Sequence, residues 1–297
     1  MPPSDAPRPR TPPLVDLLAR ALQRRHAFLA HPPTDAFRVF SGPVDARAGA
    51  SGYDGVHIDL YGPGAVLIVE EGRAPRAFDA LFAPEAGDAG DDTPHATPPP
   101  PLPALPAPVR EHAGVVLDAL RPLGVRAVYV KPFARDRSRL GGTLPACVTD
   151  PAPAAGEALP EAITIREHAW SLEARLYDGL STGLFLDQRE NRAWVHRGCA
   201  ARAQRGAAPR VLNTFAYTCA FSVAAAAGGA ETTSVDVSAR YLEWGRRNMS
   251  LNGIDPARHR FARMDTREFL DYARRKKLAY DLIILDPPSF GSGSKKK

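Results

Sequence analysis

The sequence has few cysteines, no long apolar run and no signal segment, and each shortage excludes a class of protein. Its 297 residues contain 3 cysteines, which lie far apart without a CxxC or Cys/His cluster. We expect reduced thiols rather than a zinc site or a disulfide framework. Apolar runs such as residues 282–285 are far shorter than the roughly 20 residues of a membrane-spanning helix. The Pro-rich first ten residues lack the apolar core of a secretory signal, so we expect a cytoplasmic protein.

The sequence also lacks a strong excess of either basic or acidic residues. The 38 Lys and Arg residues exceed the 33 Asp and Glu residues, which gives a formal charge of +5. This agrees with a polyanionic partner such as nucleic acid, but the two signs are interleaved and charge alone does not decide. With 44% apolar residues, the chain is long enough for two modest domains.

The pattern along the chain divides it into three parts. Residues 1–33 combine a Pro-rich start, which we expect to be disordered, with an amphipathic helix over 14–29. Residues 34–160 predict an α/β accessory domain with a Pro-rich insertion at 84–108. The elements expected there are strands at 37–40, 56–60, 66–69 and 127–131 and a helix at 109–123.

Residues 161–297 predict a different architecture. A β-hairpin over 163–175 precedes a helix over 187–205, and then strands and helices alternate. The expected strands are 211–213, 232–237, 259–264 and 280–285, and the expected helices are 221–227, 240–248 and 266–275. Strands that alternate with helices at this spacing indicate a parallel, doubly wound sheet.

Such a sheet binds its ligand beyond the carboxyl ends of its strands, where this sequence has polar residues. Asp236 follows the second strand and could accept both ribose hydroxyls of an adenosine ligand, or be a loop acid before the helix cap Ser238. Asp265 follows the third and could contact the adenine amino group, or cap the next helix, or do both.

The fourth strand ends in Asp286-Pro287-Pro288-Ser289-Phe290. Two consecutive prolines make a rigid, donor-poor turn. A planar base could stack on Phe290 while Asp286 or the turn carbonyls hold its edge; the alternative is a stiff connecting loop. No GxGxxG motif follows the first strand, which argues against nicotinamide and flavin cofactors because their pyrophosphate needs those glycines.

Three motifs carry a family resemblance: the run at 182–192 (TGLFLDQRENR), the run at 211–218 (VLNTFAYT) and the DPPSF turn at 286–290. Together they resemble the bacterial class I S-adenosylmethionine-dependent methyltransferases of large-subunit (23S) ribosomal RNA, which modify cytosine or guanine. The resemblance covers residues 163–290 well and 35–131 weakly. It implies a Rossmann-like class I fold, S-adenosylmethionine as cofactor, ribosomal RNA as partner, and an accessory domain that binds RNA.

The resemblance also assigns site residues. It places the cofactor against Thr182, Phe185, Asp187, Gln188, Arg189, Arg192, Asn213, Phe215, Ala216, Tyr217, Thr218, Asp236, Asp265 and Asp286. The base would be presented by Asp286, Pro287, Pro288 and Phe290. The two arginines lie three residues apart on one helix face. They could hold a ligand carboxylate or an RNA phosphate, or pair with Glu190 and Asp187.

The sequence departs from the family at two places. Cys219 stands where the family has glycine, so its side chain could crowd the methionine part of the cofactor; alternatively it is a small buried residue in a slightly shifted turn. The sequence also ends seven residues after Phe290, before the family's fifth strand and antiparallel pair. We therefore expect an incomplete sheet whose edge, residues 282–285, could aggregate or pair with a second copy.

The chemistry expected is methyl transfer to an RNA base. Methylation of a cytosine ring carbon needs a nucleophilic cysteine. The resemblance places that cysteine downstream of the DPPSF turn, where this chain has none. A guanine nitrogen needs only an aligned lone pair and a proton acceptor, for which Asp286 is the candidate. The alternatives are an inactive RNA-binding module that contacts phosphates and a methyltransferase for a protein or small molecule.

Overall fold

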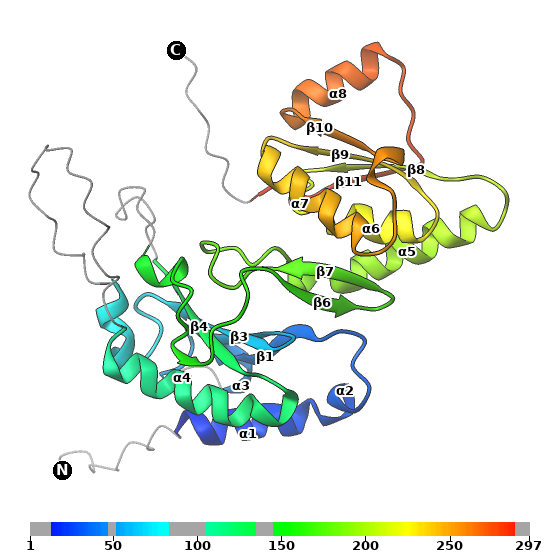
Figure 1. Ribbon diagram of the computed structural model, residues 1–297. Coiled ribbons are helices and arrows are strands. Elements are labelled where there is room, and N and C mark those ends of the chain that lie inside the picture. Colours follow the sequence, from blue (N-terminus) through cyan, green and yellow to red (C-terminus); the bar gives the residue numbers. More distant parts are fainter. Residues whose placement is uncertain (1–12, 47–51, 83–104, 135–144, 289–297) are drawn as a thin grey trace, which may run out of the picture. The chain divides into compact units, whose positions relative to one another are not determined.

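The computed structural model describes residues 13–46, 52–82, 105–134 and 145–288, and Figure 1 shows their elements. The chain forms two compact units. The first contains residues 1–163 and 175–182, and the second contains residues 164–174 and 183–297. The chain therefore enters the second unit for a short segment, returns to the first, and passes finally into the second between Thr182 and Gly183.

The first unit is built on a five-stranded sheet in the order β1-β2-β3-β4-β5. Only β3 and β4 are parallel, and the other pairs are antiparallel. The strands are β1 (Ala36–Ser41), β2 (Val56–Tyr61), β3 (Gly64–Glu70), β4 (Ala127–Phe133) and β5 (Ala155–Gly156). The remaining elements are α1 (Leu14–Arg24), α2 (His26–Ala30), α3 (Gly42–Asp45), η1 (Arg76–Phe82), α4 (Ala107–Leu120), η2 (Arg121–Leu123) and η4 (Ala146–Val148).

The apolar faces of α1 and α4 form one core with this sheet. Leu18 of α1 and Val116 and Leu120 of α4 are fully buried, as are Ile58 of β2 and Leu67 of β3. Alternate residues of each strand point to opposite faces of a sheet. On the face of the sheet that is turned to the core, every other residue of a strand is therefore apolar. The hydrophobic stripe that the sequence predicts for α1 packs against this face.

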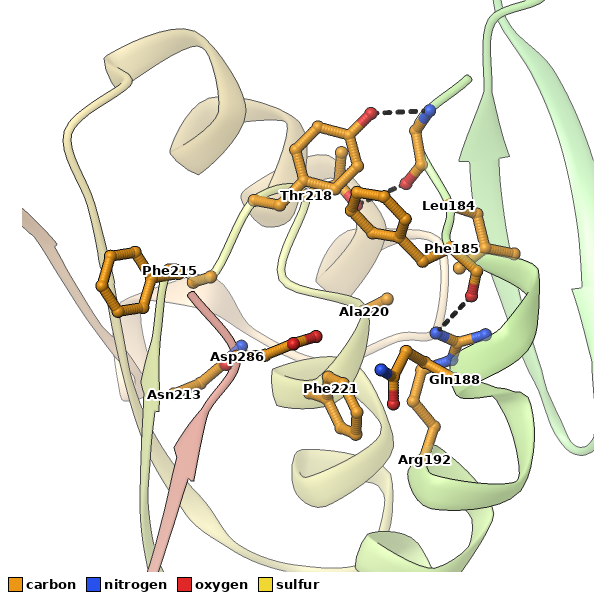
Figure 2. A pocket seen from close by; sticks show the side chains of 13 residues that line it. Leu184, Phe185, Gln188, Arg192, Asn213, Phe215, Thr218, Ala220, Phe221 and Asp286 are labelled. Carbon is orange, nitrogen blue, oxygen red and sulfur yellow. Dashed lines mark hydrogen bonds between the residues drawn. The ribbon is translucent and has the colours of Figure 1, made fainter. Parts of the chain in front are cut away.

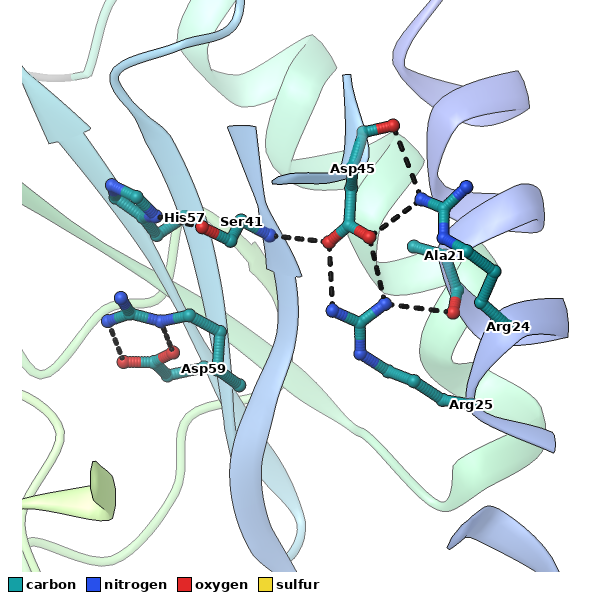
Figure 3. A network of polar contacts seen from close by, with 8 residues as sticks. Ala21, Arg24, Arg25, Ser41, Asp45, His57 and Asp59 are labelled. Atoms are coloured by element: carbon teal, nitrogen blue, oxygen red, sulfur yellow. Dashed lines mark hydrogen bonds and ion pairs between the residues drawn. The ribbon is translucent and has the colours of Figure 1, made fainter. Parts of the chain in front are cut away.

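A buried carboxylate joins α1 to the start of the sheet, as Figure 3 shows. The side chain of Asp45 is 1% exposed and accepts hydrogen bonds from Arg24 (2.6 Å), Arg25 (2.9 Å) and the backbone N–H of Ser41 (2.8 Å). Arg25 also donates to the carbonyl of Ala21 (3.0 Å). The single helix expected over 14–29 is interrupted here: α1 ends at Arg24, and Arg25 leaves the helical conformation where it binds Asp45.

The second unit contains a fully parallel four-stranded sheet in the order β10-β9-β8-β11. Its strands are β8 (Arg210–Thr214), β9 (Glu231–Asp236), β10 (Arg260–Arg263) and β11 (Leu282–Leu285). Its helical elements are η5 (Leu186–Gln188), α5 (Arg189–Ala203), α6 (Ala220–Ala227), α7 (Ala239–Ser250), η6 (Pro256–Arg258) and α8 (Thr266–Arg275). A separate hairpin of β6 (Ile163–Glu167) and β7 (Trp170–Ala174) precedes them.

Helices cover both faces of the parallel sheet. Figure 1 shows α5, α6 and α7 below the sheet and α8 above it. Val211 packs against Val195 of α5 and Ala225 of α6, whereas its neighbour Leu212 packs against Phe269 of α8. This is the layered arrangement of a doubly wound α/β fold. The alternation of strands and helices predicted from the sequence is confirmed, with ends displaced by a few residues.

The strand order creates a switch point between β8 and β11. The chain builds outward from β8 to β9 and β10, and then crosses to the other side of β8 to form β11. The connection that leaves the carboxyl end of β8 leads to α6, and residues 286–288 follow the carboxyl end of the adjacent β11; ligands bind at such a switch point in sheets of this kind. Thr214 and Leu285 are register partners at this point.

Some predictions from the sequence concern residues that the structure does not describe. Residues 84–104 of the Pro-rich insertion and Phe290 lie outside the described residues. Within the described residues, β11 has β8 as its only strand neighbour. None of the helices described is both long enough and apolar enough to cross a bilayer.

Candidate functional site

A pocket opens at the switch point of the parallel sheet, and three segments of the second unit line it (Figure 2). The first leads into the first turn of α5, the second runs from the end of β8 into the start of α6, and the third follows β11. The lining residues are Gly183, Leu184, Phe185, Gln188, Arg192, Asn213, Phe215, Ala216, Tyr217, Thr218, Ala220, Phe221 and Asp286. The second and third segments reach the pocket because parallel strands end at the same edge of the sheet.

The loop between β8 and α6 has an unusual backbone. Phe215, Tyr217 and Cys219 all have positive φ values, of 52°, 50° and 61°. This conformation costs a residue with a side chain roughly 1–2 kcal/mol, and it persists only where surrounding contacts fix it. Asp236, at the end of β9, supplies one such contact. Its carboxylate accepts hydrogen bonds from the backbone N–H groups of Tyr217 and Ser238, both at 2.9 Å.

The segment before α5 is fastened to this loop through Gly183. The Gly183 N–H donates to the hydroxyl of Tyr217 (2.8 Å), and its carbonyl accepts from the hydroxyl of Thr218 (2.6 Å). Gly183 has φ +98°, and a Cβ atom there would lie 2.4 Å from the Trp244 ring. Glycine is therefore required, both by the conformation and by the close approach of the backbone to α7.

Arg192 lies at the base of the pocket, but protein groups already engage its guanidinium. It forms a two-point ion pair with Glu167 of β6, at 2.6 and 2.7 Å. It also donates to the carbonyl of Phe185 at 2.9 Å. Arg189 pairs with Glu190 at 3.0 Å. The ion-pair alternative thus applies to both arginines, although the partner of Arg192 is Glu167, which sequence spacing does not indicate.

The remaining surface of the pocket is aromatic and polar. The Phe185 ring is 58% exposed and lies 5.3 Å from the Tyr217 ring. Figure 2 shows the Asp286 carboxylate and the Gln188 carboxamide near the Phe221 ring, with Phe215 apart from them. Such a pocket offers flat apolar faces together with a few groups that accept or donate hydrogen bonds, as small-molecule sites do.

The Asn213 side chain lines the pocket, and buried hydroxyl groups fix its position through hydrogen bonds. It donates to the Ser222 hydroxyl at 3.0 Å, and Ser222 bonds to Ser234 at 2.7 Å. All three side chains are buried. The chain of hydrogen bonds fixes the carboxamide, because a buried polar group seldom remains unsatisfied.

Cys219 does not crowd the pocket. Its side chain is fully buried in a cluster with Ala216 and Leu242 and is not among the lining residues. The backbone therefore follows the left-handed turn for which the family uses glycine, and the side chain points toward α7. Burial raises the pKa of the thiol to about 12, so it is not a nucleophile at neutral pH.

Other residues assigned from the sequence lie outside the pocket. Thr182 belongs to the first unit, where its hydroxyl donates to the Tyr61 hydroxyl (2.8 Å). Asp265 caps α8 by accepting from the Arg267 N–H (2.8 Å), which confirms its capping role. The remaining residues that do not line it are Asp187, Arg189, Asp236, Pro287 and Pro288.

The sequence analysis also overlooked pocket residues: Gly183, Leu184, Ala220 and Phe221. Gly183 and Leu184 stand inside the 182–192 motif, and Ala220 and Phe221 lie two and three residues after the 211–218 motif. Counting every residue of the first motif and extending the second by three residues would have included all four.

Comparison with known proteins relates this unit to a family. Residues 153–296 match the family model described as S-adenosylmethionine-dependent methyltransferase. This segment is therefore similar to the members of that family. The methyltransferase match spans both the hairpin and the parallel sheet, and the fold is the Rossmann-like class I type predicted from the sequence.

Two curated relatives of this methyltransferase segment are named as ribosomal RNA enzymes. "Ribosomal RNA large subunit methyltransferase K" of Neisseria meningitidis serogroup B is 47% identical over 117 residues, which are 39% of this chain and 31% of that protein. "Ribosomal RNA large subunit methyltransferase K/L" of Hahella chejuensis is 46% identical over 133 residues, which are 44% of this chain and 17% of that protein. The chain thus matches at most about a third of either relative.

A solved structure resembles more of the chain. SMU.776, a protein classed as a methyltransferase and crystallised with SAH, is 29% identical with a TM-score of 0.67. The match covers 95% of this chain and 59% of that one.

Proposed function

We propose that this chain binds S-adenosylmethionine in the pocket between β8 and β11, and that it acts in methyl transfer to a base of large-subunit ribosomal RNA. The observation that carries the proposal is the pocket at the switch point, lined by Asn213, Phe215, Thr218 and Asp286 from the carboxyl-end regions of β8 and β11. The names of the curated relatives support RNA as the substrate, and the SAH complex of SMU.776 supports the cofactor.

The donor set of the pocket fits this cofactor. S-adenosylmethionine has a carboxylate, a cationic sulfonium and a flat adenine, and it lacks the pyrophosphate for which a glycine-rich turn is needed. The first residues of α6, Ala220 and Phe221, line the pocket, so the helix N-terminus offers backbone N–H groups to a carboxylate. The aromatic faces of Phe185, Phe215 and Phe221 suit a planar ring.

Two assignments from the sequence change under this proposal. Arg192 supports the loop that covers the pocket, since Glu167 and the Phe185 carbonyl engage its guanidinium. Asp236 holds the Tyr217 N–H with one carboxylate oxygen and the Ser238 N–H with the other, and each oxygen retains a lone pair for a ribose hydroxyl. The contact of Asp265 with adenine stays a prediction.

The bound cofactor supplies an electrophilic methyl group, and the chain orients the base that receives it. Asp286 is the candidate for this task, because its carboxylate lines the pocket at the end of β11 and the two exposed prolines that follow it restrict the turn. A carboxylate there can accept a hydrogen bond from an amino group of the base, or take up the proton that a guanine nitrogen releases.

The distribution of charge supports contact of RNA with the methyltransferase part rather than with the accessory part. Residues 161–297 contain 22 Lys and Arg against 15 Asp and Glu, a formal charge of +7. Residues 34–160 contain 11 against 16, a formal charge of −5. The accessory region is therefore acidic, which does not favour the expected binding of RNA phosphates by this region. A ribosomal RNA substrate also agrees with a cytoplasmic location.

The test is transfer of a tritiated methyl group from S-adenosylmethionine to purified large-subunit RNA, with SAH binding measured by calorimetry. We expect Asp286→Asn to reduce transfer at least about tenfold while SAH affinity changes little, since one charged hydrogen bond is lost. Asp271→Asn, an exposed acid of α8 outside the pocket, is the matched control and should transfer normally.

Absence of SAH binding by the unmodified chain would contradict the proposed site. SAH binding without transfer to RNA, but with transfer to protein or small-molecule acceptors, would contradict the proposed substrate. Salt-sensitive RNA binding without SAH binding would select the alternative of an inactive RNA-binding module.

A further inference from the structure

Two asparagines bind the backbone of β7: Asn248 near the end of α7, and Asn252, which lies two residues beyond the last residue of that helix. Asn252 bonds twice to Ser171: its Oδ1 accepts from the Ser171 N–H (2.8 Å), and its Nδ2 donates to the Ser171 carbonyl (2.7 Å). Asn248 accepts from the Glu173 N–H at 2.8 Å. The two asparagine side chains thus satisfy backbone groups at alternate positions of β7, where no further strand pairs.

Only one of the two asparagines also reaches the pocket. The Nδ2 of Asn248 donates to the carbonyl of Thr218 at 2.9 Å. Thr218 lines the pocket, and its hydroxyl in turn donates to the Gly183 carbonyl. A continuous set of hydrogen bonds therefore runs from the backbone of β7 through Asn248 to both segments that form the pocket wall. Asn248 is fully buried, so water cannot replace it without rearrangement.

The position of this hydrogen bond gives it a role beyond stability. Thr218 stands between Tyr217 and Cys219, which both have positive φ values. A strained loop of this kind depends on its surroundings to keep one conformation. Asp236 fixes the loop at the Tyr217 N–H, and Asn248 fixes it two peptides later at the Thr218 carbonyl. If either the Asp236 or the Asn248 contact is lost, fewer hydrogen bonds hold the loop in its strained conformation.

We propose that Asn248 is a positioning residue of the pocket: it holds the Phe215–Cys219 loop in the conformation that binds the ligand. The identity of the ligand rests on the function proposed above, but the effect on the loop does not. Asn252 is the internal control. It lies just after the same helix and binds the same strand, and its hydrogen bonds within the described part of the chain go to Ser171 and Asn248 rather than to the loop.

The experiment compares Asn248→Ala with Asn252→Ala in the full chain. Hydrogen exchange followed by mass spectrometry reports on residues 215–220, whose N–H groups at Ala216, Tyr217 and Cys219 are hydrogen-bonded. Calorimetry gives the affinity for SAH, and thermal unfolding gives the stability of each variant. If Asn248→Ala does not fold, Asn248→Ser provides the same comparison with a smaller loss of polar atoms.

We expect both variants to lower the unfolding temperature, because each removes buried hydrogen bonds. Only the Asn248 variant should speed exchange at residues 215–220 and weaken SAH binding, by about tenfold or more. Equal exchange at 215–220 in the two variants would overturn the proposal, as would faster exchange with unchanged SAH affinity. If the unmodified chain fails to bind SAH but the difference in exchange holds, Asn248 still positions the loop, and the proposed function is what fails.

Discussion

Gly245 of α7 leaves the space that the side chain of Cys219 occupies. A Cβ atom built on Gly245 would lie 2.4 Å from the Cys219 Sγ and 2.7 Å from its Cβ. The family resemblance leads one to expect glycine at the position of Cys219, and its φ of 61° is one that glycine adopts without cost. Because Gly245 has no side chain, the Cys219 side chain fits against α7 and does not enter the pocket.

This relationship predicts the effect of two substitutions together. Gly245→Ala should destabilise the second unit by about 1–3 kcal/mol and weaken SAH binding, because the added methyl group displaces the loop. Adding Cys219→Gly should restore both quantities, whereas Cys219→Ala should restore less because its Cβ still meets the new methyl group. The measurements are denaturant unfolding and calorimetry. Independent, additive effects of the two substitutions would contradict the compensation.

The buried pair of Arg192 and Glu167 predicts a large loss of stability when one partner is removed. Both side chains are at most 2% exposed. Arg192→Met should cost about 3–5 kcal/mol because it leaves the Glu167 carboxylate buried without its charge partner. Arg189→Met is the control: its partner Glu190 is 69% exposed, and such a pair contributes roughly 0–1 kcal/mol.

The same pair allows a rescue experiment. Glu167→Leu combined with Arg192→Met removes both charges, so most of the lost stability should return. Chemical denaturation of the two single variants and the double variant measures this. If the double variant is as unstable as Arg192→Met, the cost arises from the lost contact with the Phe185 carbonyl rather than from the unpaired carboxylate.

The network around Asp45 predicts acid sensitivity of the first unit. Burial alone would raise the pKa of this carboxyl, but the hydrogen bonds from Arg25, Arg24 and the Ser41 N–H outweigh it and lower the pKa. A lowered pKa in the folded state means that the unfolded chain binds the proton more readily in acid. The stabilisation is therefore present above the ordinary value of 3.8 and is lost as the pH falls through the lower, folded-state pKa.

Asp45→Asn should accordingly lower the unfolding free energy at neutral pH and reduce its decline in acid. Asp16→Asn, on the exposed side of α1, is the control and should leave the acid decline unchanged. Unfolding of each variant between pH 2 and about pH 7 gives the comparison. An acid decline of the same size in Asp45→Asn would show that other carboxylates cause it.

Lys131 predicts a dependence of the same sign, a rise in stability with pH, in a higher pH range. Burial lowers the pKa of its ammonium to about 7, although Asp178 nearby opposes the shift. Between the folded value and the ordinary value of 10.5, the unfolded chain binds more protons, so stability should rise with pH. The rise is at most about 1.4 kcal/mol per pH unit.

Lys131→Met tests this dependence. The variant removes the charge but keeps a side chain of similar length, so its stability should exceed that of the unmodified chain at pH values below the folded pKa and should rise less with pH. It also removes the hydrogen bond from the Lys131 ammonium to the Ser181 carbonyl (3.1 Å), which limits the gain. Parallel pH profiles for the two proteins would contradict the assignment to Lys131.

The sequence by itself determined the elements of the second unit and the edge of the sheet where its pocket lies. Apolar periodicity is local, so the strand at 211–213 and the helix at 266–275 were predictable within a few residues. Asn213 lies near the end of β8 and Asp286 directly follows β11, and parallel strands bring such positions together whatever the rest of the fold does.

Only the tertiary structure decided how the polar groups at that edge are used. Arg192 binds Glu167, 25 residues away, and Asp236 binds the N–H of Tyr217. Arg25 ends α1 by binding Asp45, 20 residues away. From the sequence, a local partner or a ligand was a plausible contact for such side chains. The contact that each one makes depends on which distant groups are buried beside it, because a buried charge needs a partner. The spacing of residues along the sequence does not show which distant groups become neighbours.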